Sequence, residues 1–366
     1  MRRVVIIMAG GAGERFWPAS RRSRPKQLLR LTDPKRTLIA EAVERISPLI
    51  PPADVYIATN RALQQPIRLA LPNVPPENVL AEPARRNTAG CLTFAASCLA
   101  ARFDDPASVS AAVLTADHAI GDEVRFRELV DLALERAEES PELVTIGIAP
   151  TRPETGYGYI EVAGDEAPSA GRAGRVAAFH EKPDRETAER FVASGHLWNS
   201  GMFFFRLNTF LAALEEHLPF HAEGCRALQE IWRRSPDESR GDELLTTFEA
   251  LPSVSIDVGV FEKARNVSVV PADFPWDDVG AWDALARVRP RDTAGNVIDG
   301  EPIVLDSEGC IVYDDAKGAR LIAVLGCDDL VVVSTDDAIL VCPKSRAQDV
   351  RRIVSALKER GREDLL

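Results

Sequence analysis

The chain has 366 residues and a formal net charge of −12, with 45% hydrophobic and 27% charged residues. This length exceeds that of one usual hydrophobic core, so we expect a large α/β domain with a smaller appendage. The acidic balance argues against a general nucleic-acid-binding protein, because binding to a phosphate backbone requires a basic face. The apolar runs are too short for a signal peptide or a membrane span, so no membrane partner is expected.

Six cysteines are scattered along the chain and form no CxxC pair. Their spacing indicates neither a zinc site nor a redox dithiol. We expect reduced, mostly buried thiols, which is their usual state in a cytosolic enzyme, and we therefore predict a cytoplasmic localisation.

Strand-like and helix-like segments alternate in the first half of the chain. Strands are predicted at residues 4–8, 55–59, 113–115 and 144–148, and helices around 38–46, 88–102 and 126–137. This α/β alternation predicts a Rossmann-like sheet, mixed but mostly parallel, flanked by helices. A binding crevice is expected beyond the carboxyl ends of its strands.

Shorter β segments follow and are expected to form the second wall of the crevice, at residues 157–162, 176–180 and 201–205. Further on, short apolar runs are divided by glycine, asparagine and aspartate turn residues, which predicts a small β-rich unit. An amphipathic helix closes that unit at 349–360. The expected domains are therefore an α/β domain over 1–289 and a β-rich C-terminal domain over 290–366.

Residues 8–29, MAGGAGERFWPASRRSRPKQLL, place a glycine-rich turn behind a predicted strand and a basic segment behind that turn. Glycine tolerates a positive φ and has no Cβ, so such a turn can approach a phosphate closely. The spacing fits neither the GxGxxG fingerprint nor the P-loop. A different phosphate-binding loop is indicated, formed by Gly10, Gly11, Gly13 and Arg15 and followed by Lys26.

The pattern GG-x-G-x-R followed by PKQ resembles the sugar-nucleotide pyrophosphorylases, and the whole stretch is most similar to mannose-1-phosphate guanylyltransferases. Further motifs occur in that family's order: EPARRNTAG (82–90), LTADH (114–118), GYGYIE (156–161), HEKP (180–183), WNSGMF (198–203), SIDVGVFEK (255–263) and WDDVGAW (276–282). The resemblance covers roughly residues 3 to 345. It implies a nucleotidyltransferase fold and an enzyme that makes GDP-mannose and pyrophosphate from GTP and α-D-mannose 1-phosphate.

The reaction implied by this resemblance starts from an oxygen that is already ionised. No strong general base is needed, so catalysis becomes alignment and charge neutralisation, for which Arg15 and Lys26 are the candidates. A triphosphate also implies a divalent cation, usually Mg²⁺, held by carboxylates. Asp117, after a predicted buried strand, and Asp278 are the expected ligands. Asp277 is the reserve candidate, because the family more often has Trp-Ser-Asp at this place.

The sugar phosphate is expected opposite the nucleotide. The resemblance implies that Gly158 offers backbone contacts to the sugar and that Glu181 and Asn199 bind its hydroxyls. It also implies that Lys182 neutralises the phosphate of the sugar.

Guanine is expected near the backbone of Gly10 and Gly11 and near Asn87 and Thr88. Glu82 has two interpretations, either accepting a hydrogen bond from a guanine N–H or capping the turn that follows.

Other charged residues are expected to have structural roles. Four arginines behind the glycine-rich turn are expected on a solvated face: Arg21, Arg22, Arg24 and Arg30. His217 and His221 are predicted to lie partly exposed in a loop, because Pro219 would interrupt a helix that aligned them.

Two other functions remain open at this point. The first is a pyrophosphorylase for another pair of nucleoside triphosphate and hexose 1-phosphate, since the glycine-rich loop is shared across the wider group. The second is a non-catalytic regulatory subunit that binds a sugar nucleotide. We expect a homodimer, and two roles for the β-rich tail are open: pairing at an exposed strand edge or packing as an interface. The bifunctional form of the family adds an isomerase domain, and we expect this chain to be monofunctional.

Overall fold

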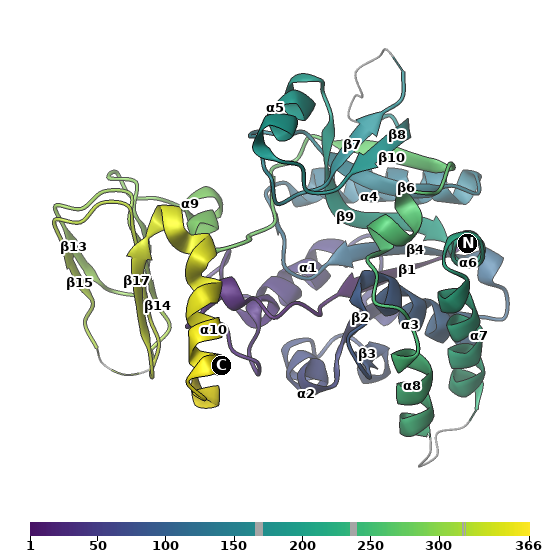
Figure 1. The fold of residues 1–366 in the computed structure, drawn as a ribbon, viewed down its shortest axis with the longest axis horizontal. Coiled ribbons are helices and arrows are strands. Elements are labelled where there is room, and N and C mark those ends of the chain that lie inside the picture. The colour runs from purple at the N-terminus through teal and green to yellow at the C-terminus, as the bar shows by residue number, and fades with distance from the viewer. Residues whose placement is uncertain (165–170, 235–239, 317, 319) are drawn as a thin grey trace.

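Figure 1 shows the computed structural model, which describes residues 1–366 except 165–170, 235–239, 317 and 319. A large α/β part lies beside a smaller β-rich part, and α10 (Arg351–Glu359) lies between them. Among the described residues, no helix has both the length and the apolar character needed to cross a bilayer.

The larger part is built on a nine-stranded sheet with the order β3-β2-β1-β4-β9-β6-β10-β8-β7. The strands are β1 (Arg2–Met8), β2 (Val55–Asn60), β3 (Val79–Glu82), β4 (Val109–Thr115), β6 (Leu143–Ile148), β7 (Tyr159–Val162), β8 (Gly174–His180), β9 (Leu197–Arg206) and β10 (Val267–Ala272). Of these strands, β8 and β9 run opposite to the others. The prediction of a mixed, mostly parallel sheet is therefore confirmed.

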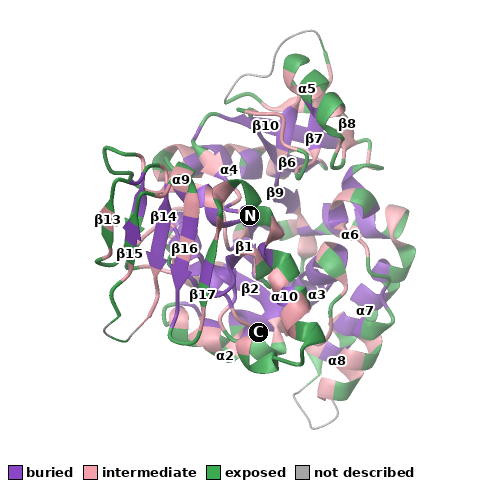
Figure 2. Ribbon diagram, turned by 60° about the vertical axis from the view of Figure 1, so that its left-hand side comes forward, coloured by how far each residue is buried: buried purple, intermediate pink, exposed green. Residues whose placement is uncertain are grey.

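Helices cover both faces of this sheet. In chain order they are α1 (Leu38–Ile46), α2 (Arg61–Ala70), α3 (Asn87–Arg102), α4 (Glu123–Glu139), α5 (Arg185–Ala193), α6 (Leu207–His217), α7 (Pro219–Arg233) and α8 (Arg240–Glu249). The short helix α9 (Leu285–Val288) lies instead beside the β-rich part. Alternate residues of β1 face opposite sides, so Val5 and Ile7 pack towards α1 and α4, whereas Val4 and Ile6 pack towards α3 and α7. Figure 2 shows most of these strands as buried between partly exposed helices, whereas β8 at the outer side of the sheet is partly exposed.

His217 and His221 do not lie in a loop, so that prediction is wrong. His217 ends α6, and Pro219 begins α7 instead of breaking it. Proline suits the first turn of a helix, where its missing N–H would have no intrahelical partner. His221 is fully buried within α7.

The register of the sheet brings distant segments to one edge. Met8 at the end of β1 pairs with Thr115 at the end of β4, so the glycine-rich loop and Asp117 emerge side by side. A short antiparallel pair, β5 (Ala119–Ile120) and β11 (Trp276–Asp277), then aligns Asp277 with Ala119. Three of the predicted motifs therefore converge beyond the carboxyl ends of the parallel strands.

In its described residues, the β-rich part contains two small sheets, between which the chain passes repeatedly. One has the order β12-β14-β16-β17 and the other pairs β13 with β15. Their strands are β12 (Val297–Asp299), β13 (Ile303–Leu305), β14 (Ile311–Asp314), β15 (Ala323–Leu325), β16 (Leu330–Ser334) and β17 (Ile339–Pro343). Successive strands within each sheet pair in parallel, except for β16 with β17. Such coiling is typical of a β-helix.

A shared hydrophobic core joins the two parts. Phe16 and Trp17, behind the glycine-rich loop, pack in one cluster with Trp282, Tyr313 and Val354. The Trp282 indole N–H donates to the Trp17 carbonyl oxygen over 3.0 Å. Burial of side chains of this size contributes about 1.5–3 kcal/mol each. The β-rich part is therefore fixed against the segment that carries the phosphate-binding motif.

Two of the four arginines expected on a solvated face are instead engaged with the β-rich part. Arg21 forms an ion pair with Asp337 at 2.7 Å, and Arg24 forms one with Asp315. The side chain of Arg22 is 63% exposed, as expected. The prediction was wrong for Arg21 and Arg24, because their acidic partners lie about 300 residues away in sequence, at spacings of 316 and 291.

Candidate active site

The glycine-rich loop has one glycine with a crowded backbone and two glycines whose backbone has no close neighbours. Gly13 has a φ of +64°, and a Cβ there would lie 2.5 Å from the Lys26 Cβ. Only glycine permits this approach, which seats Lys26 beneath the loop. At Gly10 and Gly11 a Cβ would meet nothing within 4 Å. Their exposed backbone therefore remains open to a ligand.

Lys26 lies at the centre of the convergent segments. Its side chain is only 9% exposed, and its Nζ lies 2.9 Å from the Asp117 Oδ2. The same ammonium donates a hydrogen bond of 2.6 Å to the backbone carbonyl oxygen of Asp278. One buried cation thus connects the end of β4, the glycine-rich loop and the segment behind β11.

Asp117 is held as a carboxylate by its neighbours. Burial by itself would raise its pKa, but the charge of Lys26 and the hydrogen bond from its ammonium are among the influences that outweigh burial and lower it. His118 has a lowered pKa, chiefly because of burial. Its Nδ1 accepts a hydrogen bond of 3.2 Å from the Trp276 indole N–H, which keeps the ring fixed beside Asp117.

The two neighbouring aspartates behind β11 have different surroundings. Asp278 lines the same cavity as Asp117, and its Oδ1 accepts a hydrogen bond of 2.6 Å from the Tyr157 hydroxyl. Burial and the charge of Asp278 raise the pKa of Tyr157, so the phenol remains a donor. Asp277 is buried and paired with the Arg287 guanidinium at 2.6 Å. The geometry therefore favours Asp278 over Asp277 as the metal-binding candidate.

A cavity of about 550 Å³ opens over these residues. Its lining comprises Ala12, Gly13, Glu14, Arg15, Lys26, Arg85, Asp117, His118, Asp278, Gly280 and Arg351. The cavity thus brings together the residues predicted to neutralise charge, Arg15 and Lys26, and those predicted to bind the metal ion, Asp117 and Asp278. Two further cations, Arg85 and Arg351, were missed by sequence reasoning. Arg85 belongs to the EPARRNTAG motif, whereas Arg351, the first residue of α10, had no sequence signal.

The predicted sugar-binding residues form a second group around β7, β8 and β9. A Cβ at Gly158 would lie 2.9 Å from the Glu181 Oε2 and 3.4 Å from the Asn199 Cβ. The Lys182 Nζ donates to the Glu181 Oε1 over 2.6 Å. The backbone N–H of Asn199 donates to the Gly158 carbonyl oxygen over 2.8 Å. All four residues are therefore neighbours, although they come from three separate motifs.

Asp257 joins this second group and was not predicted. It begins a π-helical turn, Asp257–Phe261, a rare element that often occurs at functional sites. Its Oδ1 accepts a hydrogen bond of 2.7 Å from the Asn199 Nδ2. Burial raises the pKa of Asp257. The SIDVGVFEK motif was the available signal for this residue.

The residues proposed near the base are not among those lining the 550 Å³ cavity. Asn87 is exposed with a φ of +58° at the start of α3. The Thr88 hydroxyl oxygen accepts a hydrogen bond of 2.8 Å from the Ile256 N–H, which ties α3 to the segment before the π-helical turn. Glu82 ends β3, and burial raises its pKa to about 7. The start of α3 has no side-chain cap.

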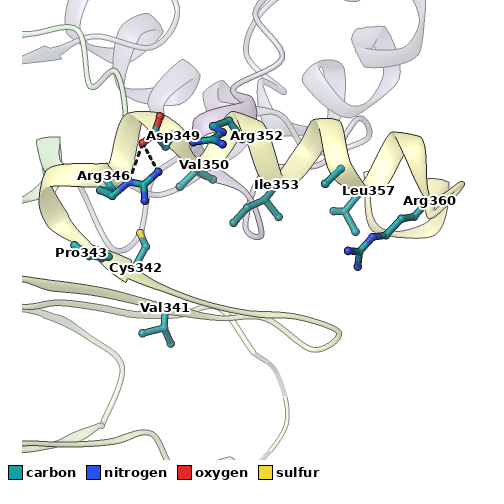
Figure 3. A pocket seen from close by; sticks show the side chains of 11 residues that line it. Val341, Cys342, Pro343, Arg346, Asp349, Val350, Arg352, Ile353, Leu357 and Arg360 are labelled. Carbon is teal, nitrogen blue, oxygen red and sulfur yellow. Dashed lines mark hydrogen bonds and ion pairs between the residues drawn. The ribbon is translucent and has the colours of Figure 1, made fainter.

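A larger cavity of about 650 Å³ lies between β17 and α10 (Figure 3). Its lining includes the aliphatic residues Val341, Ile353 and Leu357. Its carboxylate, Asp349, is paired with Arg346 at 2.9 Å. It lacks the convergence of carboxylates and cations seen beside the glycine-rich loop, so the smaller cavity is the candidate active site.

Comparisons with known proteins show which family and fold this chain is similar to. Residues 4–295 match the nucleotidyl transferase family, and residues 300–357 match the MannoseP isomerase/GMP-like beta-helix domain. The xanthan biosynthesis protein XanB of Xanthomonas campestris pv. campestris (strain B100) is 40% identical over 364 residues, which cover 98% of this chain and 74% of XanB. The mannose-1-phosphate guanylyltransferase of Klebsiella pneumoniae is 39% identical over 365 residues, with the same coverage of 98% and 74%. The crystal structure of a mannose-1-phosphate geranyltransferase from Thermus thermophilus has a TM-score of 0.85 and 38% identity, covering 98% of this chain and 100% of that chain.

Proposed function

This chain belongs to the nucleotidyl transferase family, in the branch of the mannose-1-phosphate guanylyltransferases, and on that premise we propose its substrates, metal and site residues. It is a nucleotidyltransferase that transfers GMP from GTP to α-D-mannose 1-phosphate, giving GDP-mannose and pyrophosphate. The assignment of the active site rests on the position of Lys26. It connects Asp117 and Asp278 beneath a cavity that three arginines also line.

The transfer exchanges one bond to phosphorus for another. A phosphate oxygen of mannose 1-phosphate attacks the α-phosphorus of GTP, and the bond from that phosphorus to the β-phosphate oxygen breaks. Pyrophosphate leaves with the negative charge of that oxygen. Arg15, Arg85 and Arg351 line the cavity where this charge must be met. Cations fixed in advance around a developing charge lower the barrier without reorganising at the moment of reaction.

Nucleotidyltransferases generally use a divalent metal ion, and we propose Mg²⁺ here. Asp117 and Asp278 line one cavity and supply the oxygen ligands that hard divalent cations prefer, so the residues fit the ion. When bound, the ion supplies charge neutralisation at the phosphate oxygens. Lys26 and Tyr157 would hold the two carboxylates in position through the contacts described above.

The second group of residues is proposed to bind the sugar phosphate. Glu181 and Asn199 would accept and donate hydrogen bonds to sugar hydroxyls. Lys182, 63% exposed, is free to turn from Glu181 towards a phosphate. Gly158 would contribute its backbone. Near guanine we retain Gly10, Gly11, Asn87 and Glu82 as proposals, and Thr88 as a residue that positions α3.

Pyrophosphate release across a matrix of substrates tests this function. Four nucleoside triphosphates are combined with mannose, glucose and N-acetylglucosamine 1-phosphates in the presence of Mg²⁺. Release dominated by GTP with mannose 1-phosphate is expected. A different preferred pair would assign another pyrophosphorylase specificity. If no pair gave pyrophosphate release and the protein still bound GDP-mannose, the result would assign the regulatory role.

Arg351→Ala is expected to raise the KM for GTP by roughly tenfold and to leave the KM for mannose 1-phosphate within about twofold. A hydrogen bond to a charged group contributes about 1.5–3 kcal/mol, and exposed Arg351 should lie near the lower end. Steady-state kinetics with each substrate varied measure the effect. Arg352→Ala is the matched control, because Arg352 lines the other cavity (Figure 3). Equal KM values for GTP in the two variants would contradict the role of Arg351.

We also propose a homodimer formed through the domain over 290–366. Ile303 pairs with Ala323 and Leu305 with Leu325, so period-2 alternation places all four side chains on one face. β13 and β15 lie at the end of the molecule away from the large sheet (Figure 1), and Ile303, Leu305 and Leu325 are 46%, 56% and 67% exposed. Exposed apolar patches of this kind mark interaction surfaces.

Light scattering coupled to size exclusion tests the dimer. The native chain is expected near twice its 40.0 kDa mass, and Leu305→Glu is expected near the monomer mass. A native monomer, or an unchanged dimer in Leu305→Glu, would contradict this interface.

The six cysteines are free thiols, which supports a reducing compartment and the proposed cytoplasmic location.

A further inference from the structure

Two histidines and one glutamate meet on the outer strands of the large sheet. Glu161 lies on β7, His180 ends β8, and His196 directly precedes β9. β7 pairs with β8 on one side and with β9 on the other. In these registers Tyr159 is opposite His180, and Ile160 is opposite Leu197. Alternation along the strands therefore directs Glu161, His180 and His196 to the same face.

The three side chains present their ligand atoms to one another. The Glu161 Oε2 lies 3.3 Å from the His180 Nε2 and 4.0 Å from the His196 Nε2. All three ligand atoms lie within 4.8 Å of one another. In a tetrahedral zinc site, with bonds of about 2.0–2.1 Å, ligand atoms are about 3.3–3.5 Å apart. A small contraction would therefore place all three around one ion.

A packed aromatic ring holds both imidazoles in place. Phe191 on α5 stacks on His196, with ring centroids 4.5 Å apart, and lies 4.6 Å from His180. The side chain of His196 is only 11% exposed, whereas Glu161 is 46% exposed, so the cluster has a rigid inner wall and an open outer side. This rigidity limits the side-chain entropy that an ion would have to overcome.

We propose that Glu161, His180 and His196 form a binding site for a transition-metal ion of the zinc class. Two imidazoles and one carboxylate favour Zn²⁺, Co²⁺ or Ni²⁺, whereas Mg²⁺ prefers an all-oxygen environment. Three protein ligands leave the fourth position to water. The site is separate from Asp117 and Asp278, and it does not depend on the proposed substrates.

The position of this site gives it a consequence for the neighbouring residues. His180 is adjacent to Glu181 and Lys182, and His196 lies three residues before Asn199. An ion that joins β7, β8 and the start of β9 fixes the ends of the strands that carry this group. The metal therefore acts as a positioning element beside the second group of site residues.

Cobalt binding to the metal-stripped full chain tests the proposal. One equivalent of Co²⁺ is expected to give the intense visible absorption of a tetrahedral site, and Zn²⁺ in equimolar amount is expected to displace it while excess Mg²⁺ does not. His196→Gln and Glu161→Gln are each expected to weaken cobalt binding at least tenfold. This figure is a lower bound, because changes of residues that only hydrogen-bond to metal ligands already lower metal affinity by about 10–100-fold. His217→Gln, at the end of α6, is the matched control.

Circular dichroism establishes that each variant is folded. Glu161 is half-buried and on the open side of the cluster, so its loss leaves the inner wall intact. Binding that is unchanged in both ligand variants would overturn the proposal. A cobalt signal that instead disappears in Asp117→Asn would place the ion at the carboxylate pair and would also overturn it. A rise in melting temperature with Zn²⁺ in the native chain, absent from His196→Gln, would support it independently of any enzymatic assay.

Discussion

Asp117→Asn is expected to lower kcat by about 10²- to 10³-fold, the usual effect of removing one group that stabilises charge in a transition state. The substitution keeps the size of the side chain but removes the negative charge that Lys26 stabilises. The amide also becomes a poorer ligand for a divalent cation than the carboxylate. The expected loss therefore lies in turnover and in the dependence of the rate on Mg²⁺.

Initial rates of pyrophosphate release, measured over a range of Mg²⁺ concentrations, check this result. Asp104→Asn is the matched control, because Asp104 is exposed and lies before β4 at the opposite end of that strand from Asp117. Its rate and Mg²⁺ dependence should equal those of the native chain. Near-normal turnover of Asp117→Asn with an unchanged Mg²⁺ dependence would remove Asp117 from the site.

The glycine-rich loop and Asp117 could be predicted because their signals are local. In each case an apolar strand precedes polar or glycine residues, and parallel strands deliver their carboxyl ends to one edge. Gly13 and Lys26 also follow this logic, since the close approach of their backbones requires glycine. Sequence patterns thus predicted residues that the structure brings together around one cavity.

Choosing between Asp277 and Asp278 required the structure. The two residues are adjacent in sequence, and only the pairing of β11 with β5 turns Asp277 towards Arg287 and Asp278 towards the cavity. Motif resemblance ranked Asp278 first but supplied no physical reason. The register of two short strands, which sequence patterns do not specify well, supplies that reason.

Arg351 could not be predicted because its position depends on tertiary packing. The β-rich part docks onto Phe16, Trp17 and Trp282, and this contact brings the start of α10 to the cavity. The ion pairs of Arg21 and Arg24 depend on the same docking. Contacts between residues about 300 positions apart leave no local pattern, so the basic segment was only partly interpreted from the sequence.

Lys26→Met is expected to have the broadest effect, because it removes the buried cation that Asp117 and the Asp278 backbone share. Breaking a buried ion pair leaves an uncompensated charge and costs about 3 kcal/mol of unfolding free energy, the lower end of the usual range. We choose that end because the Asp117 side chain is 29% exposed. Turnover is expected to fall at least as far as in Asp117→Asn. Lys35→Met, at an exposed position, is the matched control.

The pH dependence distinguishes this ion pair from a merely structural lysine. In the native chain the lowered pKa of Asp117 gives stability that is present above the unfolded pKa of about 3.9 and is lost as the pH falls through the folded value. Without Lys26, burial remains as the largest influence and raises this pKa. The stability difference between the native chain and Lys26→Met should therefore grow from acidic to neutral pH, and the acid limb of kcat/KM should move to higher pH. Urea unfolding and kinetics across this range measure both, and parallel pH profiles in the two proteins would show that Lys26 does not control the charge of Asp117.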